Sequence, residues 1–102
     1  AVNKKITAYG GYFMRAVITV IGKDTVGILA KVSQICFEFN ANIIDVTQTV
    51  MEDLFVMVML ADISKLSESF TTFSDSLDQL GEAQNLKIRA MHEDLFNSMH
   101  KI

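Results

Sequence analysis

The stretch from Leu54 to Ala61 places the strongest constraint on how this chain folds, because every residue in it is apolar. It is far shorter than the roughly 20 apolar residues that a membrane-spanning helix needs. Its length suits a β-strand, and a strand that is apolar on both faces must be covered on both sides. The sequence therefore predicts a central strand in a sheet.

The pattern from Met14 onward predicts the order strand, helix, strand, strand, helix, strand. Apolar residues recur at helical spacing in the two helices, whereas residues 42–51 and 86–90 alternate between apolar and polar. Asn40 is expected to end the first helix in a left-handed conformation, Ser64 or Ser67 to cap the second, and Gly81 to close it. The predicted strands are 15–21, 42–51, 54–60 and 86–90; the helices are 28–39, 66–80 and a short terminal one within 95–102.

The character of each strand predicts its place in the sheet. The first and third strands are apolar on both faces and belong in the centre, while the second and fourth alternate and belong at the edges. Right-handed crossovers put both helices on one face. This is an α+β, ferredoxin-like βαββαβ sandwich with a four-stranded antiparallel sheet, two helices on one face and a short C-terminal helix.

Two helices leave the other face of the sheet uncovered. In the third strand Leu54, Val56, Val58 and Leu60 point one way and Phe55, Met57 and Met59 the other. We expect the set of Phe55, Met57 and Met59 to need another cover, and the terminal helix, the N-terminal segment and a second subunit are the candidates. A sheet edge also invites pairing with a symmetry mate, so we predict a homodimer.

Residues 1–13 lack a clear period and carry a glycine pair, so we interpret them as a non-native or flexible extension before a single domain at 14–102; an extra strand is the alternative. No signal-peptide pattern is present, and the single cysteine fits a reducing compartment, so a cytoplasmic location is expected. Twelve acidic residues against nine basic ones give a net charge of −3. This balance argues against nucleic-acid binding, and no membrane association is expected.

The turn between the first strand and the first helix is the main candidate for a binding site. A helix start presents unpaired backbone N–H groups, which favour a small carboxylate, and Gly27 permits close approach. The alternative is an ordinary turn in which Asp24 or Thr25 caps the helix. Asn42 and Ile43, at the start of the second strand, are expected to lie near this turn, and the amide of Asn42 is able to hydrogen-bond a ligand.

No catalytic set or metal-ligand spacing is recognisable. His92 and His100 match no metal motif, and Cys36 lies on the apolar stripe of a helix. We expect surface histidines, a core cysteine and a solvated acidic helix face, and we predict no enzymatic activity, no cofactor and no metal.

Two motifs together resemble an ACT domain: D-x-x-G-I from Asp24 to Ile28 and N-I-x-D from Asn42 to Asp45. The likeness extends over about residues 14–91. With the ending at 96–100, the chain looks closest to small stand-alone, uncharacterised ACT-domain proteins, which are similar to the glycine cleavage system repressor and to the N-terminal part of formyltetrahydrofolate deformylase.

This resemblance implies a regulatory module that dimerises side by side and binds an amino acid at the interface. Carried over residue by residue, the contacts are Asp24, Gly27, Ile28 and Leu29, with Asn42 and Ile43 opposite, from the neighbouring subunit. Val26 departs from the family, in which many loops have proline here. The alternative function is a ligand-free interaction module that regulates a separate enzyme or regulator, so an unidentified protein partner is a further expectation.

Overall fold

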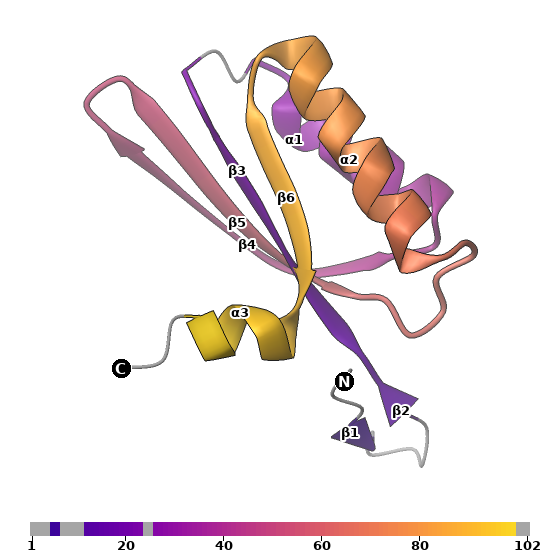
Figure 1. The fold of residues 1–102 in the computed structure, drawn as a ribbon. Coiled ribbons are helices and arrows are strands. Elements are labelled where there is room, and N and C mark those ends of the chain that lie inside the picture. Colours follow the sequence, from indigo (N-terminus) through magenta and orange to yellow (C-terminus); the bar gives the residue numbers. More distant parts are fainter. Residues whose placement is uncertain (1–4, 7–11, 24–25, 100–102) are drawn as a thin grey trace.

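The computed structural model describes residues 5–6, 12–23 and 26–99, and its central feature is one four-stranded antiparallel sheet (Figure 1). The sheet has the order β4-β5-β3-β6. The elements are β3 (Arg15–Gly22), α1 (Ile28–Glu38), β4 (Asn42–Met51), β5 (Leu54–Asp62), α2 (Phe70–Gln84), β6 (Lys87–His92) and α3 (Glu93–Met99). The strand order and the fold class predicted from the sequence are confirmed.

The N-terminal segment contributes a separate pair of short strands. β1 (Lys5–Ile6) pairs antiparallel with β2 (Tyr12–Phe13), and neither joins the main sheet. Residues 1–4 and 7–11 lie outside the described part of the chain. The interpretation of residues 1–13 as an extension remains a prediction.

The face of β5 that packs against the helices differs from our expectation. Met57 and Met59 are fully buried, and their partners on β3 are the fully buried Val20 and Ile18. Leu54, Val56, Val58 and Leu60 therefore form the uncovered set, and the prediction for Phe55, Met57 and Met59 was wrong. The larger side chains fill the space beneath α1 and α2, a preference that apolar alternation alone does not reveal.

The core lies between this face and the two helices. Phe73 and Leu77 of α2 and Val32 and Cys36 of α1 are at most 1% exposed. The Phe73 ring lies 5.5 Å from Phe39, centroid to centroid, and 6.2 Å from Phe70. Such tilted aromatic contacts stabilise beyond the area that they bury.

The observed ends of α1 agree with the sequence-based prediction better than the observed ends of α2 do. Asn40 has φ 60°, which confirms the left-handed stop after α1. α2 begins at Phe70 with Ser69 as its cap, and it ends at Asn85 with φ 57°, so the predictions of Ser64 or Ser67 and of Gly81 were wrong. Residues before Ser69 are held otherwise: the Ser64 N–H donates to the Asp62 carboxylate and the Ser67 N–H to the Phe39 carbonyl.

Replacing the observed cap of α2 tests this boundary. The Ser69 hydroxyl accepts a hydrogen bond from the Thr72 N–H at 3.1 Å. We expect Ser69→Ala to lower the free energy of unfolding by about 1 kcal/mol, measured by urea denaturation, because it removes this acceptor. Ser67→Ala is the matched control and is expected to change stability by less than about 0.5 kcal/mol. A larger loss in the Ser67 variant would contradict the assigned start.

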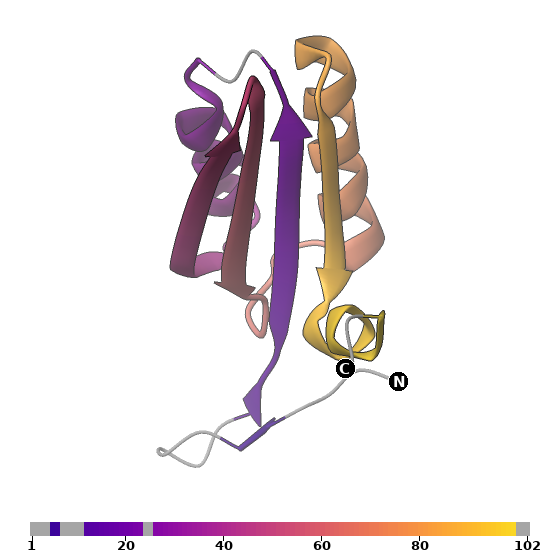
Figure 2. The ribbon, with the colours of Figure 1, turned by 90° about the vertical axis from the view of Figure 1, so that its left-hand side faces the viewer.

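α3 stands on the side of the sheet opposite to α1 and α2. Figure 1 shows it extending away from the sheet, and Figure 2, which views that face, shows it nearly end-on. It contacts β3 and β6 near the end of the sheet where β3 begins. Val17, on the uncovered face at that end, is 5% exposed, so the terminal helix covers part of the face, as one of our candidates predicted.

Candidate functional site

The turn that leads into α1 begins at the end of β3. Gly27 precedes the helix with φ 72° and ψ 7°, a left-handed conformation that glycine adopts without steric cost, and no side chain of the described residues caps the helix. The first helical bond runs from the Lys31 N–H to the Gly27 carbonyl at 3.1 Å. The N–H groups of the first turn thus have no acceptor within the helix and point out of its N-terminus.

The side chains around this turn differ in exposure. Ile28 is 3% exposed and anchors the helix in the core, whereas Leu29 is 39% exposed and Val26 is 88% exposed. A Cβ placed on Gly27 would have no heavy atom of the described residues within 4 Å, so the backbone is open on this side. Asp24, predicted as a contact and as a possible cap, lies outside the described residues, as does Thr25.

Asn42 and Ile43 do not lie near this turn within one chain. The strand register places Asn42 opposite Asp62, which in turn pairs with Arg15 at the start of β3. The turn follows Gly22 at the other end, where Gly22 pairs with Phe55. Seven residue steps along β3 separate the two ends by roughly 23 Å. Our expectation that these residues are neighbours was therefore wrong for a single subunit.

β4 is an edge strand with a largely exposed surface. It bonds only to β5 in the sheet as described, and most of its residues are exposed, including Ile44 at 42% and Val50 at 68%. The register shifts between Ile43 and Asp45, which places a β-bulge at Ile44. Bulges redirect side chains and are common near binding sites. Beyond the bulge the pairing runs regularly from Asp45 to Met51.

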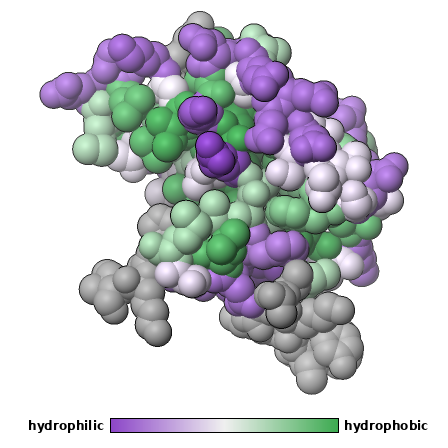
Figure 3. Space-filling view, in the orientation of Figure 1, coloured by the Kyte–Doolittle hydropathy of each residue, from purple (hydrophilic) through white to green (hydrophobic). Residues whose placement is uncertain are grey.

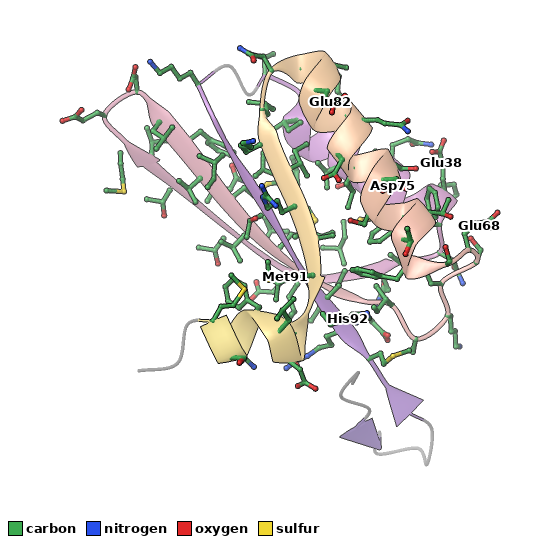
Figure 4. All side chains as sticks on the ribbon, in the orientation of Figure 1. Glu38, Glu68, Asp75, Glu82, Met91 and His92 are labelled. Atoms are coloured by element: carbon green, nitrogen blue, oxygen red, sulfur yellow. The ribbon has the colours of Figure 1, made fainter. Side chains whose placement is uncertain are left out.

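His92 is not the surface histidine that we expected. It lies at the lower end of β6 (Figure 4), and its ring stacks on Phe70 with centroids 4.3 Å apart. Its Nδ1 is buried and has no hydrogen-bond partner in the described part of the molecule. Burial lowers the pKa of His92, and the nearby charge of Asp94 opposes this shift. In the sequence, His92 continues the every-second-residue pattern of Ile88 and Ala90. This pattern was the available signal that His92 faces the helices. His100 lies outside the described residues.

Cys36 is a core residue, as predicted. It is 1% exposed, and burial raises the pKa of its thiol to about 11, so the thiol stays protonated at neutral pH. The acidic residues Asp75, Asp78 and Glu82 are exposed on α2, also as predicted, and Figure 4 labels Asp75 and Glu82. Among the described residues no group of histidine, cysteine and carboxylate side chains is arranged to hold a metal ion, and no helix is long and apolar enough to cross a membrane.

Comparison with known proteins shows which protein family this chain belongs to. The ACT domain family matches residues 15–91, which is most of the chain, and this chain belongs to that family. A UPF0237 protein from Methanococcus maripaludis is 48% identical over 86 residues, covering 84% of this chain and 96% of the relative.

Solved structures agree with this assignment. An ACT domain protein from Streptococcus pneumoniae superposes with a TM-score of 0.71 at 36% identity, over 81% of this chain and 93% of that one. A glycine cleavage system transcriptional repressor gives a TM-score of 0.64 at 26% identity, over 78% of this chain and 46% of the repressor. The predicted resemblance to small ACT-domain proteins is thus confirmed.

Proposed function

We propose that this chain is a non-enzymatic regulatory ACT-domain protein that works as a homodimer and binds a small molecule, such as an amino acid, between its subunits. The functional unit is the domain from residue 14 to residue 102, and its proposed place of action is the cytoplasm. Two observations together carry the proposal. The N-terminus of α1 is exposed, and β4 is an edge strand whose outer side pairs with no other described strand.

Antiparallel pairing of two β4 edges supports a shared site. In such a dimer the start of one β4 lies beside the end of the other. The end of β4, at Val50, is level with Phe55 and hence with the end of β3 that leads into the turn. Asn42 and Ile43 of one subunit would then approach the Gly27 turn of its partner. Their separation within one chain accords with a site built from two chains.

The ligand's carboxylate would lie on the backbone N–H groups of Gly27 and Ile28. Partial positive charge at a helix start favours an anion there. Leu29, 39% exposed, would contact the apolar part of the ligand, and the Asn42 amide of the partner would hydrogen-bond its polar group. Because the ligand contacts both chains, its binding stabilises the dimer and links occupancy to assembly.

A thermal-shift screen against the twenty amino acids tests this site. At about ten times its Kd a ligand that binds only the folded protein adds ~1.4 kcal/mol, which raises Tm by several degrees, roughly 4–8 °C per kcal/mol. Asn42 is exposed, so Asn42→Ala should leave the fold intact. We expect this variant to reduce the ligand-induced shift in Tm by at least half. Gln79→Ala, exposed on α2, is the control and should respond like the unmodified protein. No shift with any amino acid at millimolar concentration would contradict the proposal.

One observation favours a second function, a ligand-free module that docks on a separate enzyme or regulator. Phe37 is 79% exposed on α1, and an exposed aromatic side chain is a common anchor in protein interfaces. This function predicts that no amino acid raises Tm. It also predicts that Phe37→Ala abolishes copurification of a reproducible partner while leaving Tm unchanged.

A further inference from the structure

β6 forms the edge of the sheet opposite to β4, and its outer side pairs with no other described strand. Figure 2 shows β6 at this edge, with α2 running alongside and behind it. Every second residue of an edge strand directs its N–H and C=O groups outward, where they can pair with an added strand. In the described part of the chain, no backbone hydrogen bond outside the sheet involves residues 87–90. β6 therefore offers unpaired backbone groups along most of its length.

A groove, which we call the β6 groove, lies between this edge and α2. It has a volume of about 240 Å³, and Leu86 and Ile88, each at most 9% exposed, line it. The rest of its lining consists of four exposed, charged residues: Asp78 and Glu82 from α2, and Lys87 and Arg89 from the β6 strand. Within the described part of the chain, none of these four charged side chains takes part in an ion pair. The groove thus holds two acids and two bases that are not used by the fold.

The opposite charges of the β6 groove lie on the two sides of the strand. Ile88 is 3% exposed and faces the helices, so its neighbours Lys87 and Arg89 face the other side of the sheet. Asp78 and Glu82 project from α2, which covers the helix side. Figure 3, with β6 at the front, shows hydrophilic surface over the upper part of β6 and along α2. A segment that lies along this edge therefore meets carboxylates on one side and cations on the other.

The spacing of these charges matches that of a β-strand. Asp78 and Glu82 are separated by a rise of about 6 Å along the helix, and α2 runs alongside β6 (Figures 1 and 2). Lys87 and Arg89 are separated by about 6.6 Å of extended chain. In a strand, residues two apart share a face at the same spacing, and the residues between them face the other way. An added strand can therefore place successive residues of one face beside the acids and those of its other face beside the bases.

We propose that β6 binds an extended segment of another protein as an additional strand, and that this segment alternates basic residues toward α2 with acidic residues toward the uncovered side of the sheet. Backbone hydrogen bonds to β6 provide affinity, and the alternating side chains provide specificity. The basic residues of the segment lie beside Asp78 and Glu82, and its acidic residues lie beside Lys87 and Arg89. The β6 groove does not include Gly27, so the proposal is independent of a ligand at that turn.

A second copy of this chain fits the same edge poorly. When two β6 strands pair antiparallel about a two-fold axis with the fullest overlap, Arg89 of one copy lies opposite Arg89 of the other, and like charges directly opposite destabilise a sheet. The β4 edge offers no base to α2, since Val46, Gln48 and Val50 are the residues that share the face of Met57. No described strand of this chain alternates basic and acidic residues. The charges therefore favour a segment of a different protein.

Peptide titration followed by NMR tests the proposal. The probe is the hexapeptide Lys-Glu-Lys-Glu-Lys-Glu with both termini blocked, so that it has no net charge. We expect saturable shifts of the amide signals of residues 87–92. The isomer Lys-Lys-Lys-Glu-Glu-Glu has the same composition but mixes both charges on each face, and it should bind at least about tenfold more weakly. The alternating peptide with every backbone nitrogen methylated has no N–H to donate to β6, and it should also lose at least about tenfold in affinity.

Charge reversal on the protein provides the second measurement. D78K/E82K and K87E/R89E each give both sides of the groove the same sign, so each should weaken the alternating peptide at least about tenfold. The two pairs of changes combined exchange the signs, and the same peptide regains its affinity by moving along β6 by one residue. All four positions are exposed, so the circular dichroism spectrum should not change. Lys65→Glu, exposed outside the groove, is the control and should bind like the unmodified protein.

Four results would overturn the proposal. The first is no binding of the alternating peptide at millimolar concentration, which would mean that the charges only deter pairing at this edge. The second is equal binding of the block isomer or the methylated peptide, and the third is a combined variant as weak as the two double variants. The fourth is a fall in assembly mass when the peptide binds, which would show that a second copy occupies β6. None of these results depends on amino-acid binding at Gly27, so the two proposals fail separately.

Discussion

Phe73→Ala is expected to lower the free energy of unfolding by about 3–5 kcal/mol, the range for removing a buried aromatic ring. Phe73 is fully buried between α2 and the sheet and contacts both Phe39 and Phe70. Its loss leaves a cavity that rigid helices on a sheet do not close. Since domains of this size are stable by about 5–15 kcal/mol, the variant should keep only part of its stability.

The free energy of unfolding is measured by urea denaturation, with circular dichroism as the signal. Thermal unfolding is measured in parallel. Tm should fall by at least ~12 °C, because each kcal/mol corresponds to about 4–8 °C in a domain of this size. Phe37→Ala is the matched control: the same substitution on α1, at a side chain that is 79% exposed, should cost less than about 0.5 kcal/mol. Equal losses in the two variants would contradict the packing of α2 described above.

The second large effect is expected at Gly81, in the interior of α2. A Cβ at this position would lie 2.7 Å from the Leu86 carbonyl oxygen and 3.3 Å from the Ile88 N. Because both atoms belong to the backbone, they are unable to move aside like a flexible side chain, and Gly81→Val must push α2 away from β6. We expect a loss of about 1–3 kcal/mol or more from this overpacking.

The control for Gly81→Val is Ala83→Val on the exposed side of the same helix. It introduces the same β-branched side chain, whose lower helix propensity costs at most about 0.7 kcal/mol. Urea denaturation of both variants separates the contact with β6 from helix propensity. A Gly81 variant as stable as the Ala83 variant would show that α2 and β6 are further apart than the structure places them.

The order of the strands was predictable because the apolar pattern of each strand shows whether one face or both faces are buried. β3 and β5 are apolar on both faces and lie in the centre, while β4 and β6 alternate and lie at the edges. Which face of β5 meets the helices was not predictable, since Leu54 to Leu60 is apolar on both sides and only packing distinguishes them. The start of α2 was missed for a related reason. Leu66 fits the helical period, but it packs against the core from the turn before the helix.

The candidate site was predictable only in its local parts. The glycine turn before α1 has a sequence signal, and Gly27 adopts a left-handed φ there, whereas its role as a ligand contact stays a prediction. The distance from Asn42 to this turn follows from the predicted fold itself: a right-handed crossover makes β4 parallel to β3, so β4 starts at the end of the sheet opposite to the turn, and our expectation overlooked this. The inward position of His92 depends on how far β6 continues, and β6 extends to residue 92 rather than 90.

The pairing of β6 with β3 also has a consequence for how the chain reaches this structure. β3 is near the beginning of the chain and β6 near its end, yet Val20 pairs with Ile88 in the middle of the ladder. Contacts so distant in sequence form slowly, because a long loop must close first. During synthesis β3, β4 and β5 emerge well before β6. Until β6 follows, β3 has an open edge, so the nascent chain is most prone to aggregate in that interval.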